Sequence, residues 1–523
     1  MPASKEWTHE LEDLHRRRDF AEAMGGPAAI EKVRSLGRLN ARERVSALVD
    51  AGTFREFGGL AGKGRYSDDG TLESLTPSTQ VMGLARLESR KCVVVADDFT
   101  IRGGSSEAAV AEKWIYAERY AYEYKLPIVR MVDTAGGSVK LLKQMGHTKI
   151  PGYALLPSVN LLGRSPVVGI AMGACAGLGA VRASWSHLSI MIKGRSQVFA
   201  GGPPVVKQAL GYDIDKESLG GHEVHRVSGV VHNAVDTEDE AFATARRFLS
   251  YLPTNVWEAP PRILTGDPAA RTEGSLNDAI PRDRRKVFLP RRILNEIFDK
   301  GTLFEIAPEF GGSLITSFAR LDGYAVGVMI NNPIVMGGAL TRAASIKMER
   351  FVDLCDTFHL PIVNLVDQPG TMTGLNAERD GTMAATLRAR SAIEQSSVPW
   401  VAVVIRRCFG LAGAMLSPRF GPTGTALPHH FAWPSARWGS IPVEGGVAAA
   451  YRQEIEAAPD PLAKRAELEA GYHALSSPFR TAEKFGVVDV IEPASTRPLL
   501  CDWAEDAHQI TLHSLGPKAR GMR

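Results

Sequence analysis

Short apolar runs alternate with longer amphipathic stretches along much of the chain. The runs CVVVAD (92–97), IVRMVD (128–133) and VVGIAM (167–172) are rich in Val and Ile and have the length of buried strands. Helix-length segments lie between such runs, for example SEAAVAEKWIYAERYAYEYK (106–125) and TMAATLRARSAIEQSS (382–397). Strands and helices in alternation, joined by glycine-rich turns, predict a layered α/β architecture.

One apolar stretch, SPVVGIAMGACAGLGAV (165–181), carries no charge over 17 residues. That length is at the lower limit for a membrane-spanning helix. Its many Gly and Ala residues favour a buried strand that leads into a glycine turn. The N-terminal residues MPASKEWTHELEDLHRRRDF are charged and lack the apolar core of a signal peptide. We therefore expect no membrane association and a cytoplasmic location.

The same pattern occurs twice. ADDFTIRGG ends at Gly103–Gly104, and INNPIVMGG ends 234 residues later at Gly337–Gly338. The same separation relates Lys113 to Lys347, Asp133 to Asp367 and the ARLE and ARLD segments, and a separation of 233 relates Pro166 to Pro399. Ordinary α/β periodicity would not hold such a constant spacing, so duplication of one domain is the simpler explanation.

The length of 523 residues also exceeds what one hydrophobic core supports. Residues 253–278 are rich in Pro and Gly and are expected to link two halves. The 61 Lys and Arg residues nearly balance 58 Asp and Glu residues, which argues against a dedicated nucleic-acid surface. The five cysteines lie far apart without a CxxC pair, which suits a reducing compartment.

The glycine turns that follow buried strands are the candidate functional sites. Gly177, Leu178 and Gly179 form one such turn, and residues 410–413 form the equivalent turn in the second half. Residues without bulky side chains let backbone N–H groups approach a ligand oxygen, and the start of a following helix reinforces them. Two such amides can form an oxyanion hole beside a thioester carbonyl. Close packing of a helix on a strand is the alternative explanation.

Other catalytic motifs are absent from the sequence. There is no GxxxxGK[ST] phosphate loop and no GxSxG nucleophile elbow. HEVH at His222–His225 is one residue too short for the HExxH zinc motif. We therefore expect no metal site, and we expect these histidines, like His232 and His429–His430, to be hydrogen-bonded loop residues.

At these positions the sequence resembles the carboxyltransferase (β) subunits of propionyl-CoA and methylcrotonyl-CoA carboxylases. The likeness spans nearly the whole chain and rests on ordered segments. They are GRLNARERVSALVDAGTFREF, ADDFTIRGG, VDTAGGSVK, VFAGGPPVVKQALG, LGGHEVHRVSGVVHNAVD, VDQPGTMTGLNAERDG, FGLAGAMLSPRF and FAWPSARWGSIPVEGG.

The resemblance implies two crotonase-like (ClpP/crotonase) domains. Residues 5–262 would be the N-terminal carboxyltransferase domain on the acyl-CoA side, and 275–515 the C-terminal domain on the carboxybiotin side. The family implies a hexameric core bound to a biotinylated α subunit, with each active site between the N-half of one subunit and the C-half of another. The chain has no ATP-grasp pattern and no AMKM-type biotinyl motif, so biotin must come from that partner.

The resemblance also implies roles for individual positions. Backbone amides would stabilise the reacting oxygens at Gly177, Leu178 and Gly179 on the thioester side, and at Leu411 and Ala412 on the biotin side. Substrate-binding positions would be Gly103, Gly104, Gly136, Gly137 and Ala414, and cofactor-binding positions would be Gly410, Gly413 and Gly370. Ala414 stands where propionyl-type relatives carry an acidic residue, so the acyl group stays open and a C5 or larger acyl chain is expected to fit.

Two alternatives remain open at this stage. A decarboxylase or transcarboxylase subunit would share these motifs, and only its partner proteins would distinguish it. A catalytically silent scaffold that docks a partner would keep the fold and lose the chemistry.

Overall fold

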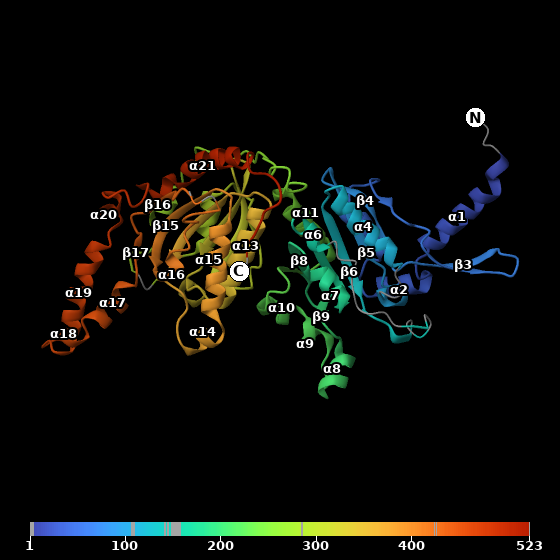
Figure 1. Cartoon of the computed structure of the whole chain (residues 1–523), viewed down its shortest axis with the longest axis horizontal. Helices are drawn as coiled ribbons and strands as arrows, with labels where there is room; N and C mark the ends of the chain where they lie inside the picture. The colour runs from blue at the N-terminus through green and yellow to red at the C-terminus, as the bar shows by residue number, and fades with distance from the viewer. Residues whose placement is uncertain are drawn as a thin grey trace. The chain divides into compact units, whose positions relative to one another are not determined.

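The computed structural model describes residues 5–105, 110–140, 143, 146–147, 158–283, 286–422, 424, 426–521 and 523. The chain divides into two compact units, residues 1–250 and 251–523. Each unit contains one large twisted sheet flanked by helices (Figure 1).

The first unit is built on an eight-stranded sheet of order β1-β4-β5-β6-β7-β8-β10, with β9 paired to β7. The strands β1, β4 and β5 pair antiparallel, and the pairings from β5 to β10 are parallel. The strands are β1 (Arg55–Glu56), β4 (Gln80–Leu87), β5 (Arg90–Asp97), β6 (Ile128–Thr134), β7 (Val167–Ala176), β8 (Leu188–Ile192), β9 (Gln197–Phe199) and β10 (Asn233–Val235), beside a separate hairpin of β2 (Gly62–Tyr66) and β3 (Leu72–Pro77).

The second unit repeats this sheet in the order β11-β12-β13-β14-β15-β16-β18, with β17 paired to β15. Its strands are β11 (Phe304–Glu305), β12 (Leu314–Leu321), β13 (Tyr324–Asn331), β14 (Ile362–Gln368), β15 (Trp400–Phe409), β16 (His430–Ala432), β17 (Arg437–Gly439) and β18 (Asp489–Val490). In the first unit Gln80 pairs with Asp97, and 234 residues later Leu314 pairs with Asn331. The prediction of a duplicated α/β domain is confirmed.

Some helices also recur at the repeat spacing, such as η2 with η4 and α4 with α13. The first unit contains η1 (Lys5–Trp7), α1 (Thr8–Glu22), α2 (Pro27–Ser35), α3 (Ala41–Leu48), η2 (Arg102–Gly104), α4 (Ala111–Glu123), α6 (Ser158–Leu161), α7 (Leu178–Ser184), α8 (Pro203–Leu210), α9 (Lys216–Gly220), α10 (His222–Ser228) and α11 (Glu238–Tyr251). The second contains η3 (Gly274–Asp278), α12 (Pro290–Ile297), η4 (Met336–Gly338), α13 (Arg342–Thr357), α14 (Leu375–Arg379), α15 (Thr382–Gln395), α16 (Gly410–Gly413), α17 (Val443–Ala450), α18 (Arg452–Glu456), α19 (Pro461–Leu475), α20 (Pro478–Ala482), η5 (Pro493–Ser495) and α21 (Thr496–Thr511).

The central strands are buried on both faces, which explains their continuous apolar runs. On one face of the second sheet, alternate residues such as Val326 and Val328 pack with α12 and α21. On the other face Gly327 lies under α13, where a Cβ would overlap the Cys355 sulfur. A glycine at this strand position therefore lets helix and sheet approach closely.

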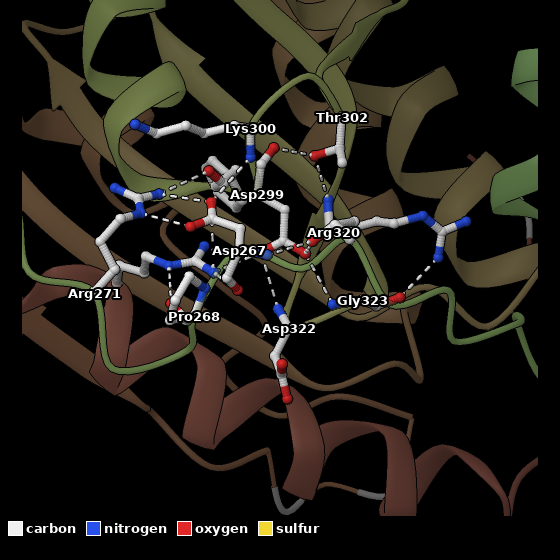
Figure 2. Close-up of polar contacts among 12 residues, drawn as sticks. Asp267, Pro268, Arg271, Asp299, Lys300, Thr302, Arg320, Asp322 and Gly323 are labelled. Atoms are coloured by element: carbon white, nitrogen blue, oxygen red, sulfur yellow. Dashed lines mark hydrogen bonds and ion pairs between the residues drawn. The ribbon is translucent and has the colours of Figure 1, made fainter.

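A buried polar cluster fastens the predicted linker, residues 253–278, to the second unit (Figure 2). The carboxylate of Asp299 accepts hydrogen bonds from the N–H groups of Asp322 and Gly323, at the turn between β12 and β13. It also accepts a 2.9 Å bond from Thr265 of the linker and pairs at 2.8 Å with the fully buried Arg497 of α21. The linker is thus fixed by charge-assisted bonds.

The first unit contains the same turn device, which sequence inspection did not single out. Asp50 accepts the N–H groups of Glu88 and Ser89 between β4 and β5, and Thr53 Oγ1 donates to the Asp50 carbonyl at 2.6 Å. Thr302 Oγ1 donates to the Asp299 carbonyl at the same distance. The signal is an Asp-x-Gly-Thr motif that occurs at 50–53 and again at 299–302.

The apolar stretch 165–181 forms β7 and the start of α7, so its interpretation as a buried strand and glycine turn is confirmed. Within the part of the chain that the structure describes, no helix combines the length and the apolar character needed to cross a bilayer.

Candidate active site

The first glycine turn connects β7 to α7. Gly177 has a φ of +55°, a conformation that side chains disfavour, and its N–H donates to the carbonyl of Phe199 at 3.1 Å. The first hydrogen bond inside α7 runs from Val181 N–H to the Gly177 carbonyl, so the amides of Leu178 and Gly179 have no acceptor within the helix. Of the three expected amides, Leu178 and Gly179 can receive a ligand oxygen, whereas that of Gly177 is occupied.

Gly179 is set against the end of β6. A Cβ at this position would overlap the Cγ2 methyl of Thr134. Thr134 Oγ1 donates to the Gly104 carbonyl at 2.6 Å and accepts the N–H of Gly136 at 3.1 Å. Thr134 therefore ties together the two loops that contain the predicted substrate-binding glycines and packs against the turn that contains Gly179.

These loops surround a small cavity in the first unit that opens to solvent. Of the predicted positions, Gly104, Gly136, Leu178 and Gly179 line this cavity. The lining does not include Gly103, whose carbonyl accepts the N–H of Ala135, or the exposed Gly137.

Among the described residues, four further ones line this cavity and were missed by the sequence analysis. They are Gln80, Trp114, Thr134 and Arg182. They come from β4, α4, β6 and α7, and no sequence motif joins them. The lining holds no histidine and no carboxylate, so no side chain of the described cavity wall can act as a general base.

The equivalent turn in the second unit connects β15 to α16. Gly410 has a φ of +64°, and a Cβ on Gly413 would lie 2.9 Å from the carbonyl carbon of Cys408. The amides of Leu411 and Ala412 open the short helix, as those of Leu178 and Gly179 open α7. Ala414 is exposed and ends α16, with its N–H bonded to the carbonyls of Gly410 and Leu411.

Gly370 lies in the loop after β14, where Gly136 lies after β6. Its N–H donates to the Gln368 side chain at 3.0 Å, and its carbonyl accepts the N–H of Leu340. Gln368 thus accepts the N–H of Gly370 as Thr134 accepts that of Gly136 in the first unit.

A buried carboxylate lies at the end of β6 and another at the end of β14. Asp133 pairs with Arg38 and with Arg44, the latter at 2.9 Å. Asp367 pairs with Arg406 and Arg407, each at 2.7 Å. Because these carboxylates are held by two guanidinium groups each, they act as structural charges beneath the loops rather than as free bases.

The HEVH segment lies on helix α10 (His222–Ser228) rather than in a loop, and His225 Nε2 lies 2.6 Å from the Val198 carbonyl oxygen. His232 lies in the loop after α10, with Nδ1 2.8 Å from Ser189 Oγ. His430 contacts Ser417 Oγ at 2.8 Å, and burial, with His429 and Arg419 nearby, lowers its pKa to about 4. Among the described residues, no group of three His, Cys, Asp or Glu side chains is arranged to hold a metal.

Each of the two duplicated α/β units has amides at a strand-to-helix turn that lack an acceptor within the following helix, an arrangement that can stabilise an oxyanion. Comparison with known proteins identifies the family. Residues 32–520 match the carboxyl transferase domain. The chain belongs to the carboxyl transferase domain family.

Individual relatives cover nearly the whole chain. The propionyl-CoA carboxylase carboxyltransferase subunit of Haloferax mediterranei is 33% identical over 493 residues, 93% of this chain and 94% of the relative. The methylmalonyl-CoA decarboxylase subunit alpha of Veillonella parvula is 32% identical over 494 residues, 94% of each chain. A crystal structure of transcarboxylase 12S, a hexamer with methylmalonyl-coenzyme A and methylmalonic acid bound, matches with a TM-score of 0.86. That match has 29% identity and covers 100% of this chain and 98% of the other.

The family recognised from the sequence motifs is therefore confirmed, as is the fold of two duplicated crotonase-like domains. The expectation of an enzyme of carboxyl transfer, of the acyl-CoA carboxylase type, is also confirmed.

Proposed function

We propose that this chain is the carboxyltransferase subunit of a biotin-dependent acyl-CoA carboxylase, which moves a carboxyl group from carboxybiotin to the α carbon of an acyl-CoA. The observation that carries the proposal is the pair of equivalent turns, 177–179 and 410–412, in a chain whose residues 32–520 match the carboxyl transferase domain. Each turn presents backbone amides without an acceptor inside the helix that follows.

On the acyl-CoA side, the amides of Leu178 and Gly179 receive the thioester oxygen as negative charge develops on it. Such donors lower the barrier because they are already oriented when the charge appears, and each contributes about 3 kcal/mol. Gly104 and Gly136 let the backbone approach the substrate, with Thr134 fixing both loops. The Gly177 amide serves the fold instead, through its bond to Phe199.

On the biotin side, the amides of Leu411 and Ala412 fit the ureido oxygen. Gly410, with its positive φ, and Gly413, which has no room for a Cβ against Cys408, allow the tight turn, and Gly370 adopts a positive φ in the neighbouring loop. When bound, carboxybiotin supplies the carboxyl group that is transferred. Leu411 is exposed, so its side chain is accessible to a group delivered from outside the chain.

The relatives disagree on the direction of the reaction. One is named as a propionyl-CoA carboxylase subunit, while another is a methylmalonyl-CoA decarboxylase subunit, at almost the same identity. Decarboxylation or transcarboxylation of an acyl-CoA by the same site is therefore the second candidate function. The Ala414 position, exposed at the end of α16, is our candidate determinant of acyl length.

The proposal includes partners and a location. The biotin is carried by a separate biotinylated subunit, and the chain forms a hexameric core, as does the similar transcarboxylase 12S. A cytoplasmic location agrees with the five cysteines, which are all buried and free. Burial raises the pKa of Cys92 and of Cys408 to about 12, so neither is poised for disulfide exchange.

The direct test uses the half-reaction that needs no partner. The purified chain should transfer carboxyl from methylmalonyl-CoA or a longer 2-carboxyacyl-CoA to free biotin, and should fix no bicarbonate with ATP on its own. Addition of the co-purifying biotinylated subunit should confer ATP-dependent carboxylation of an acyl-CoA panel. Absence of any biotin-dependent carboxyl transfer would favour the silent scaffold and refute the proposal.

A further inference from the structure

Three side chains form a buried polar group in the wall of the first unit's cavity. Asp97, at the end of β5, accepts two 2.9 Å hydrogen bonds from Nη1 of Arg182 and one 3.0 Å bond from Nε2 of Gln80. The three residues are 1%, 6% and 4% exposed, respectively. Gln80 and Arg182 both line the cavity, whereas Asp97 lies behind them.

This group leaves one acceptor and one donor without partners. The side-chain oxygen Oε1 of Gln80 and the Nε–H of Arg182 are buried and have no hydrogen-bond partner. The bond from Nε2 to Asp97 fixes the orientation of the Gln80 amide, because a carboxylate can accept only from the NH2 end. An unpaired buried polar atom lowers stability by about 1–3 kcal/mol. Two such atoms in residues that line one cavity therefore indicate that a hydrogen-bonding group binds there.

The internal repeat shows that the fold does not require this group. The positions equivalent to Gln80, Asp97 and Arg182 in the second unit are Leu314, Asn331 and Met415. Asp97 and Asn331 share only one hydrogen bond, to the backbone of the next strand. Asp97 accepts the N–H of Asp133, and Asn331 accepts that of Asp367. The polar group is therefore a property of the acyl-CoA side alone.

We propose that Gln80 and Arg182 form a subsite for a hydroxyl group carried by the acyl chain of the substrate. The inference rests on the proposed function, because it assumes that the acyl group enters this cavity beside Leu178 and Gly179. A hydroxyl can donate to the Gln80 oxygen and can accept from the Arg182 Nε–H, so it suits both unpaired groups. Trp114 and Leu178 supply apolar walls for the methylene groups.

Other substituents fit this subsite less well. The charge of Arg182 is already balanced by Asp97, so a carboxylate would enter a buried site without a counter-ion. An alkyl group would leave both unpaired atoms desolvated. The enzyme should therefore discriminate between acyl-CoAs of equal length by the presence of a hydroxyl group.

The experiment measures dissociation constants of the full-length chain for butyryl-CoA, 3-hydroxybutyryl-CoA and 4-hydroxybutyryl-CoA. At least one hydroxyacyl-CoA should bind about tenfold more tightly than butyryl-CoA, since a hydrogen bond to a charged donor is gained. Gln80→Leu should abolish this preference, so that the dissociation constants for butyryl-CoA and the hydroxyacyl-CoAs differ from one another by less than about twofold. A triple variant that copies the second unit, Gln80→Leu, Asp97→Asn and Arg182→Met, should do the same without a buried unpaired charge.

Gln197→Leu is the matched control, because this glutamine bonds Glu217 in the same unit and does not line the cavity. It should keep the hydroxyl preference. If butyryl-CoA and both hydroxyacyl-CoAs bind the native chain equally, a water molecule fills the subsite and the inference is overturned while the proposed function stands. Equal weakening of all three ligands by Gln80→Leu would also overturn it. Failure of the native chain to bind any thioester would instead refute the proposed function.

Discussion

At the scale of single residues, the site depends on which backbone groups are already engaged. Gly177 and Gly179 look alike in sequence, yet the amide of the first is bonded to Phe199 and that of the second opens α7. Gly179 is a glycine for a packing reason, the Cγ2 methyl of Thr134. Close helix packing therefore also explains this turn, since Gly179 both packs against Thr134 and contributes an amide at the start of α7.

Gly179→Ala should lower the rate of carboxyl transfer by at least about tenfold, because the new methyl displaces either Thr134 or the start of α7 and misplaces the amides. The rate with methylmalonyl-CoA and free biotin measures the effect. Thr134→Ser removes only the obstructing methyl and keeps the hydroxyl that bonds Gly104. The double variant should recover most of the activity, and no recovery would show that Gly179 acts otherwise.

The buried imidazole of His359 makes stability depend on pH. Its side chain is fully buried with Nε2 2.7 Å from the Val256 carbonyl oxygen, and burial, with Lys518 nearby, lowers its pKa to about 4. Between about pH 6.5 and pH 4 the unfolded chain binds a proton that the folded chain does not. The free energy of unfolding should therefore decrease as the pH is lowered through this window, by up to about 3 kcal/mol.

Thermal unfolding of native protein and His359→Gln, at about pH 7.5 and about pH 5, checks this prediction. The variant keeps a side-chain donor and should lose less stability on acidification than the native protein. Replacement of the exposed His513 by Gln is the control and should not change the pH dependence. An unchanged pH dependence in His359→Gln would contradict the assignment.

At the scale of elements, the two units neutralise a buried aspartate at the end of a central strand with arginines from different segments. Each sheet ends a central strand in a buried aspartate, and in the first unit the compensating Arg38 and Arg44 come from the N-terminal segment. Gly173 of β7 leaves room for this pair, because a Cβ there would overlap both Arg38 Nη2 and the carboxylate of Asp133. The equivalent position in β15 is Arg406, which pairs with Asp367 directly. Both units thus keep the strand that ends near a buried aspartate, but the arginines that neutralise the aspartate come from different segments.

Arg44→Met should destabilise the first unit by about 3–5 kcal/mol, because it leaves Glu238 buried without its guanidinium partner and removes one of the two from Asp133. The melting temperature of the purified protein is the measurement. Arg17→Met, which removes a pair with Asp13 on the surface of α1, should leave the melting temperature unchanged. Equal effects of the two substitutions would show that burial does not set the cost.

At the scale of the whole molecule, each unit has its own sheet and its own apolar core. Each unit also holds only part of the proposed chemistry, since the amides for the thioester lie in one and those for biotin in the other. A functional assembly must therefore bring together turns from both kinds of unit, and a closed symmetric oligomer is the usual solution.

Light scattering of the purified chain should give a mass of about 340 kDa, the value for six copies of the 56.5 kDa chain, since closed symmetric assemblies are favoured. Carboxyl-transfer activity should be confined to this species when fractions are assayed. A stable monomer with full activity would contradict both the hexamer and the expectation of a site shared between subunits.

The sequence by itself determined the fold class, the duplication and the two turns. Alternating apolar runs record burial on both faces of the central strands, and the constant separation of pairs such as Asp133 and Asp367 records one backbone used twice. Glycine clusters mark sharp turns because few other residues adopt positive φ, so the sequence alone predicted the turns at Gly177 and Gly410.

Only the tertiary structure decided which amides remain available and what surrounds them. The bond from Gly177 to Phe199 joins residues that no local pattern relates. The group of Gln80, Asp97 and Arg182 assembles from two strands and a helix, and each residue alone has an ordinary sequence context. Local patterns encode burial and backbone conformation, whereas pairings between distant polar groups depend on how strands and helices come together in space.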